Sequence, residues 1–165
     1  MNRDFETVLE EFGPLLSRVA ASYEANPARS QELTQDICLA VWQSLDGFRG
    51  ASSLKTYVLR VAHNKAVNHV AYYANKPREE DYCEVTNAGT HNNTSLEHQQ
   101  EHRQQVEQLL SHVRQLPIQT RQIVTMSMEG LSYQDIAEVC GLNVNNVGVI
   151  LNRAKKVLME SMQNV

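Results

Sequence analysis

The chain has 165 residues, of which 42% are hydrophobic, so it has room for one ordinary domain or two small helical ones and is too apolar for general disorder. No apolar run approaches the roughly 18 residues of a membrane-spanning helix. The N-terminus is acidic and amphipathic, which is not typical of a signal peptide, so we expect a cytoplasmic protein without membrane insertion. With 4 prolines, 7 glycines and little strand-like alternation, the sequence predicts an all-α fold.

The net charge of −4 is unevenly distributed along the chain. Residues 47–78 hold six lysines and arginines and no acidic residue, whereas the segments on either side are acidic. Such a basic block is either a surface that faces phosphates or an ordinary solvated helix face. Charge alone does not decide between the two.

The first half of the chain predicts three amphipathic helices. The first covers residues 5–23, where the Gly13-Pro14 pair predicts either a kink or the true start, and Asn26-Pro27 ends it. The second covers residues 31–45. The third covers residues 53–73 and begins at a serine N-cap. We expect the outer face of the third helix to carry Lys55, Arg60, His63, Asn64, Lys65, Asn68 and His69.

The second half predicts a helix-turn-helix. Residues 75–94 lack periodicity and read as a flexible linker, after which the capping box Thr94-Ser-Leu-Glu97 restarts helical structure. Another helix opens at Pro117. A short helix after Ser132, a glycine turn at 140–142 and a longer helix from residue 144 or 145 to about 162 complete the unit. We therefore expect two helical domains, 1–74 and 95–165, joined by the linker 75–94.

Cysteines and histidines give no convincing metal site. Cys38, Cys83 and Cys140 are far apart, so they read as free thiols, with Cys38 and Cys140 in the core. His98 and His102 have a spacing that can bind zinc, but no further ligands complete a set, so we favour a solvent-exposed helix face. We predict no metal, no cofactor, no catalytic residues and no small-molecule substrate.

Two separate segments resemble one family. The pieces Glu32-Leu-Thr-Gln-Asp36, Trp42, Phe48-Arg49-Gly50, Arg60-Val-Ala-His-Asn64 and Gly130-Leu-Ser-Tyr-Gln-Asp-Ile-Ala137 occur in order along the chain. Residues 30–70 thereby resemble the promoter-melting domain of bacterial RNA polymerase sigma factors, in the extracytoplasmic-function group of the sigma-70 family. Residues 116–158 resemble the second DNA-binding domain of that group.

The resemblance implies a surface that recognises and melts the −10 element. Phe48 and Asn64 match positions that line the pocket for a flipped base, although Phe48 can also be core and Asn64 plain surface. Arg60 either holds phosphate or pairs with a carboxylate of its own domain. Tyr57 stands where the family usually has Trp. The implied −10 residues are Ser44, Phe48, Arg49, Lys55, Tyr57, Arg60, Asn64, Lys65 and Asn68.

The resemblance also implies a polymerase-binding helix and a −35-binding helix. The polymerase contacts would be Gln35, Asp36, Leu39 and Trp42, although Trp42 can instead be a core anchor. The −35 contacts would be Ser132, Tyr133, Asn145, Asn146, Asn152, Arg153, Lys155 and Lys156. The family usually has basic residues and a serine where this chain has Gly148-Val149-Ile150, which predicts weak or unusual −35 recognition.

The leading hypothesis is thus an alternative sigma factor, not an enzyme, with core RNA polymerase, promoter DNA and an anti-sigma factor as partners. Two alternatives stay open. One is a sigma-derived protein that binds polymerase or a regulator without loading promoters, motivated by the depleted last helix. The other is an ordinary helix-turn-helix regulator, which leaves the N-terminal half unexplained.

Overall fold

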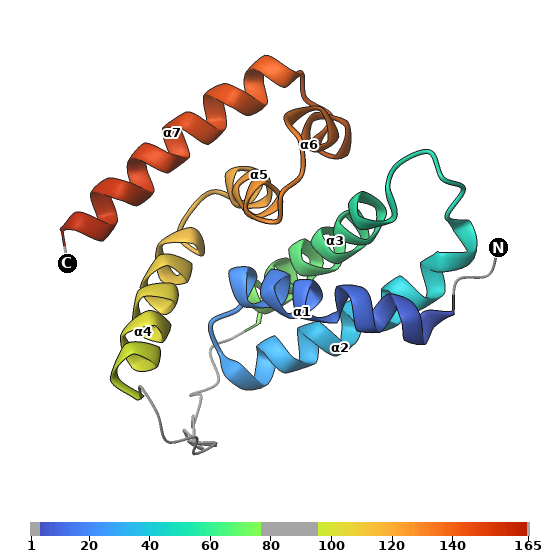
Figure 1. Cartoon of the computed structure of the whole chain (residues 1–165), viewed down its shortest axis with the longest axis horizontal. Coiled ribbons are helices and arrows are strands. Elements are labelled where there is room, and N and C mark those ends of the chain that lie inside the picture. The colour runs from blue at the N-terminus through green and yellow to red at the C-terminus, as the bar shows by residue number, and fades with distance from the viewer. Residues whose placement is uncertain (1–3, 77–95, 165) are drawn as a thin grey trace.

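The computed structural model describes residues 4–76 and 96–164, and both parts are helical, as the sequence predicts (Figure 1). In the first part, α1 (Phe5–Tyr23), α2 (Pro27–Ser44) and α3 (Leu54–Ala74) pack against one another, and the short 3-10 helix η1 (Leu45–Gly47) follows α2. We call this part the N-terminal domain. Its core is built from fully buried aliphatic side chains that include Leu16, Leu33, Ile37 and Leu59.

The second part, the C-terminal domain, contains four helices. They are α4 (Leu96–Val113), α5 (Ile118–Met128), α6 (Tyr133–Cys140) and α7 (Val144–Gln163). The long helix α7 packs against the other three and buries Val147, Leu151, Ala154 and Leu158 at steps of three and four residues. Burying a side chain the size of leucine stabilises the fold by about 1.5–3 kcal/mol.

Polar side chains define where several helices begin. Ser53, Ser132 and Asn143 each accept a hydrogen bond from a backbone N–H of the first turn that follows. These caps satisfy amides that no helical carbonyl can reach. The predicted starts of the third helix and of both helix-turn-helix helices are therefore confirmed to within one residue.

Three sequence predictions are corrected by the structure. The second helix begins at Pro27 rather than near residue 31, because Asn26 caps it and proline suits the first helical position. Pro14 lies inside α1, so the Gly13-Pro14 pair is not the start of that helix. His63 and His69 are buried rather than on the outer face of α3, since they share a side of the helix with Leu59 and Ala66.

Other predictions have mixed outcomes. Cys38 and Cys140 are only half-buried against the core, and burial raises the pKa of both thiols. The linker at 75–94 and the first residues of the Thr94 capping box fall almost wholly outside the described residues. Among the described helices, none combines the length and apolarity that crossing a membrane would need.

Candidate nucleic-acid and polymerase interfaces

The loop between α2 and α3 is held in place by Tyr57. Its hydroxyl donates a 2.6 Å hydrogen bond to the Ser44 carbonyl, and its ring lies 5.1 Å from the half-buried ring of Phe48, centroid to centroid. Gly47 passes close to the same hydroxyl, so that a Cβ at Gly47 would lie 3.4 Å from it. Tyr57 thus ties the end of α2, the loop and α3 together, and Arg49 is exposed beside this junction.

One strip of α3 carries three of the residues predicted to contact DNA. Arg60, Asn64 and Asn68 are all exposed and follow one another at four-residue steps, so they line one face of the helix. Within the described residues, no carboxylate forms an ion pair with Arg60, and its guanidinium is open to solvent. The strip therefore offers one cation and two amides to a ligand.

Lys55 and Lys65 do not join this strip in the same way. Lys65 is exposed but lies one position past Asn64, toward another side of α3. Lys55 is five residues from Arg60, which places it roughly 140° away around a helix of 3.6 residues per turn. Its ammonium approaches Gly130 of the C-terminal domain, 3.7 Å from where a Cβ on that glycine would be.

Beneath the strip lies a buried polar pair. The Tyr23 hydroxyl and His63 Nδ1 are 2.9 Å apart, and their rings meet edge to face. Burial lowers the pKa of His63 to about 3 and raises the pKa of Tyr23 well above its usual value. Both groups are consequently neutral near pH 7. Because His63 directly precedes Asn64, the pair also fixes the rotation of α3 at this point.

An unusually apolar surface lies on α2. Gln35, Asp36, Leu39 and Trp42, the predicted polymerase contacts, are all exposed, with 51% of Leu39 and 55% of Trp42 accessible to solvent. Trp42 is therefore not a core anchor. Residues 35, 39 and 42 share one helix face, and a large apolar side chain held out in water is typical of a protein-binding surface.

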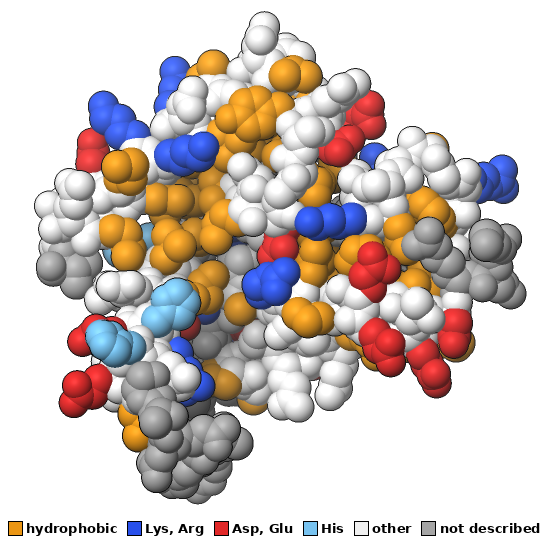
Figure 2. Space-filling view, viewed as in Figure 1, with side chains coloured by type: hydrophobic (Ala, Val, Ile, Leu, Met, Phe, Trp, Pro, Cys, Tyr) orange, Lys and Arg blue, Asp and Glu red, His pale blue; other side chains and the backbone are white. Residues whose placement is uncertain are grey.

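The helix-turn-helix has the geometry that its residues predict. Gly141 adopts a left-handed conformation with φ 68°, which ends α6 and allows the tight turn before α7. The predicted DNA contacts Ser132, Tyr133, Asn145, Asn146, Asn152, Arg153, Lys155 and Lys156 are all exposed. Hydrophobic side chains are nevertheless prominent over the C-terminal domain in the upper left of Figure 2.

The two domains touch through contacts that the sequence analysis missed. The Arg18 guanidinium donates two hydrogen bonds, of 2.8 and 2.9 Å, to the Glu129 carboxylate, and this interaction raises the pKa of Arg18. The Arg121 guanidinium lies 5.3 Å from the centroid of the Tyr23 ring. No local signal could have indicated these pairs, because their members are about a hundred residues apart in sequence.

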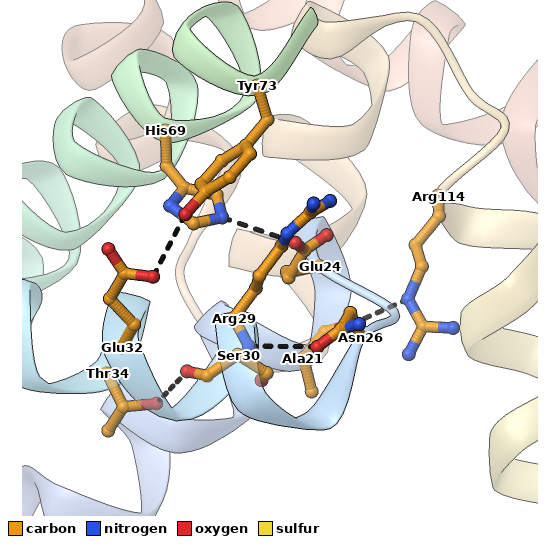
Figure 3. A network of polar contacts seen from close by, with 10 residues as sticks. All are labelled: Ala21, Glu24, Asn26, Arg29, Ser30, Glu32, Thr34, His69, Tyr73 and Arg114. Carbon is orange, nitrogen blue, oxygen red and sulfur yellow. Dashed lines mark hydrogen bonds and ion pairs between the residues drawn. The ribbon is translucent and has the colours of Figure 1, made fainter. Parts of the chain in front are cut away.

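A further contact joins the C-terminal domain to the end of α1. Arg114 Nε donates a 2.8 Å hydrogen bond to the Ala21 carbonyl, beside a group of polar contacts at the α1–α2 junction (Figure 3). In that group His69 Nε2 lies 3.5 Å from Glu24 Oε1, and the Tyr73 hydroxyl donates to Glu32. We call the state held by the Arg18, Arg114 and Arg121 contacts the closed arrangement.

His98 and His102, the pair with a zinc-like spacing, lie on successive turns of α4. His98 and His102 are exposed on α4, and His98 lies 4.0 Å from Glu101. Across residues 4–76 and 96–164, no three side chains of the types that ligate metals come together.

Comparisons with known proteins identify both domains. The family model for sigma-70 region 2 matches residues 8–75, and that for sigma-70 region 4 matches residues 106–158. The ECF RNA polymerase sigma-E factor of Haemophilus influenzae is 27% identical over 139 residues, which cover 80% of this chain and 74% of the relative. The RNA polymerase sigma-H factor of Pseudomonas aeruginosa is 25% identical, with 98% of this chain and 87% of the relative covered.

Solved structures share the fold. The sigma factor RpoE of Bartonella quintana, in complex with the anti-sigma factor NepR, gives a TM-score of 0.70 at 20% identity and covers 97% of both chains. CnrH, in complex with the cytosolic domain of CnrY, gives a TM-score of 0.69 at 19% identity, covering 97% of this chain and 88% of CnrH. The two family matches, one in each domain, define a two-domain transcription initiation factor. The chain belongs to the sigma-70 family, in its extracytoplasmic-function (ECF) group.

Proposed function

We propose that the chain is an alternative sigma factor that binds core RNA polymerase, recognises −10 and −35 promoter elements and starts transcription without performing covalent chemistry itself. The observation that carries this proposal is the pairing of the exposed α3 strip with a helix-turn-helix in one chain whose domains match sigma-70 regions 2 and 4. A protein that acts on the chromosome with bacterial polymerase works in the cytoplasm.

Promoter opening is assigned to the α2–α3 loop and the α3 strip. Opening needs bases of one strand to be unstacked and held, at a cost of a few kcal/mol per base. Asn64 and Asn68 supply amides for base edges, and Arg60 supplies a cation for the nearby phosphates. Phe48, fixed by Tyr57, provides an aromatic edge beside them.

Polymerase binding is assigned to the exposed face of α2. Leu39 and Trp42 would supply the apolar centre of this interface, and Gln35 and Asp36 its polar rim. Burying an exposed tryptophan is a typical source of binding energy at protein interfaces.

Promoter binding requires the closed arrangement to open. Elements centred near −10 and −35 are about 25 base pairs apart, or roughly 85 Å at about 3.4 Å per base pair. Domains of this size have a radius of gyration of only about 11 Å, so two domains in contact cannot reach both elements. An anti-sigma factor is the partner we expect to favour the closed state, by analogy with the complexes formed by the structural relatives.

The test is run-off transcription with purified core polymerase on candidate promoters. Asn64→Ala should lower promoter opening, followed by permanganate footprinting, by at least about tenfold, which corresponds to 1.4 kcal/mol. Asn75→Ala, at an exposed asparagine just past the C-terminal end of α3, is the matched control and should leave opening unchanged. Failure to initiate on any promoter, with folded protein bound to core, would contradict the proposal.

A second candidate rests on the recognition helix. Residues 144–152 of α7 contain no charged side chain, so the chain could bind polymerase or a regulator without loading promoters. Polymerase capture without any permanganate-reactive bases would favour this alternative.

A further inference from the structure

We infer that the helix-turn-helix reads an A·T-rich −35 element, with Val149 against thymine methyl groups and Asn145 and Asn152 on adenine edges. This inference rests on the proposed function, because it names the DNA that the same helix would take. On this inference, the unusual Gly148-Val149-Ile150 segment contributes to the sequence specificity of −35 recognition.

The first observation is the chemistry of the exposed face at the start of α7. Asn145, Val149 and Asn152 are exposed and recur at steps of four and three residues, so they share one face. Val149 keeps 48% of its surface accessible, although a valine would normally be turned inward. In helix-turn-helix proteins this part of the second helix enters the major groove.

The second observation is the packing around Gly148. A Cβ at Gly148 would lie 3.6 Å from Cε2 of Tyr133, which is an ordinary van der Waals contact, so the tyrosine ring packs directly beside this glycine. Tyr133 begins α6 and is itself partly exposed. The exposed Tyr133 ring thus lies beside Gly148, the residue that directly precedes the exposed Val149.

The third observation is where the cations lie. The first basic residue of α7 is Arg153, followed by Lys155 and Lys156, and the first carboxylate is Glu160. These three cations stand after the base-reading turns, where they can hold phosphates. The early turns have no guanidinium or ammonium to form the bidentate contact with guanine that is most common in the major groove.

The chemistry of the base edges then favours A·T over G·C base pairs. Asparagine forms a bidentate pair with adenine, and an apolar side chain contacts the C5-methyl group that only thymine carries. The distance from Asn145 to Asn152 along the helix is about 10 Å, which spans roughly three base pairs. We therefore expect a run of about three A·T pairs, with at least one thymine methyl against Val149.

The first experiment uses holoenzyme assembled from core polymerase and the full chain on promoters with a randomised −35 region and a fixed −10 element. Each promoter carries a transcribed barcode that identifies its −35 sequence, and sequencing these barcodes in the RNA should show enrichment of A·T pairs at adjacent −35 positions. Transcripts with G·C enrichment or no −35 preference would overturn this inference but leave the proposed function standing. The absence of any transcript would instead count against the proposed function.

The second experiment removes only the methyl groups. Replacing the selected thymines with uracil should weaken holoenzyme binding about three- to fivefold per methyl, as expected for one buried carbon group. Val149→Ser should weaken binding similarly on thymine DNA and should abolish the difference between thymine and uracil.

The matched control is Val157→Ser, at a valine of α7 that is equally exposed, at 50%, but two helical turns further along. It should keep the full difference between thymine and uracil. If Val149→Ser also keeps that difference, or if wild type shows none, Val149 does not read thymine.

Discussion

The ion pair between Arg18 and Glu129 offers a direct way to perturb the closed arrangement. Arg18 keeps 60% of its side chain exposed, whereas Glu129 keeps only 11%. An exposed ion pair contributes less than about 1 kcal/mol to stability. Because this pair is bidentate and its carboxylate is mostly buried, we expect a contribution near the top of that range. A loss of about 1 kcal/mol changes the ratio of closed to open molecules about fivefold.

We therefore expect Arg18→Gln to shift the chain toward open forms by about that factor. The assay is the distribution of distances between spin labels at Gln43→Cys on α2 and Glu160→Cys on α7, both exposed, in a background without the native cysteines. Longer distances should gain population in the variant. Added salt should produce a similar change in the wild type, because the arginine end of the pair is open to solvent.

Two controls make the result specific to the pair. Exchanging the partners, as Arg18→Glu with Glu129→Arg, should restore much of the closed population. Arg103→Gln removes an exposed arginine from α4 and should leave the distances unchanged. The reasoning is refuted if Arg18→Gln leaves the distribution as in wild type, or if Arg103→Gln changes it equally.

Three further predictions concern single residues. Tyr57→Phe removes the hydrogen bond to the Ser44 carbonyl and should lower the free energy of unfolding by about 1 kcal/mol. Promoter opening should fall more than polymerase binding. Equal losses in opening and binding would argue against a positioning role for Tyr57. Since the pKa of His63 is about 3 in the fold and 6.5 ordinarily, the unfolded chain alone takes up a proton between these values, so stability should fall as pH drops below 6.5. From pH 7.5 to 5.5 urea unfolding should register a loss of about 1.4 kcal/mol from this group, and His63→Gln should lack that contribution. Trp42→Ala should weaken binding to core polymerase at least about tenfold with an unchanged melting temperature, because the ring is exposed in the free chain; a fall in melting temperature would mean that Trp42 supports the fold instead.

Local signals were enough to predict most of the helices. The serine cap at Ser132, the glycine turn and the apolar spacing of α7 depend on residues close in sequence, so they predicted the helix-turn-helix closely. The start of α2 was missed because Asn26-Pro27 was interpreted only as the end of the first helix. In the structure α1 already ends at Tyr23, and Asn26 instead caps the start of α2.

The side-chain environment of α3 was harder to predict. Because histidine is polar, the sequence predicted that His63 and His69 face outward. In the structure Tyr23 and Glu24 lie opposite them and allow both rings to be buried. The interdomain contacts could not be predicted for the same reason. The ion pair of Arg18 is made with a carboxylate 111 residues away in the sequence. Partners brought together only by the tertiary fold leave no pattern in neighbouring residues.

Through the hydrogen bond from Arg114 to the Ala21 carbonyl, the C-terminal domain caps the C-terminal end of α1 in the N-terminal domain. The last turn of α1 has no basic residue of its own, and its carbonyls lie beyond the reach of helical amides. When the domains separate, water replaces a guanidinium at that helix end. Hydrogen exchange in the last turn of α1 therefore becomes a label-free gauge of domain separation, readable in the unmodified protein.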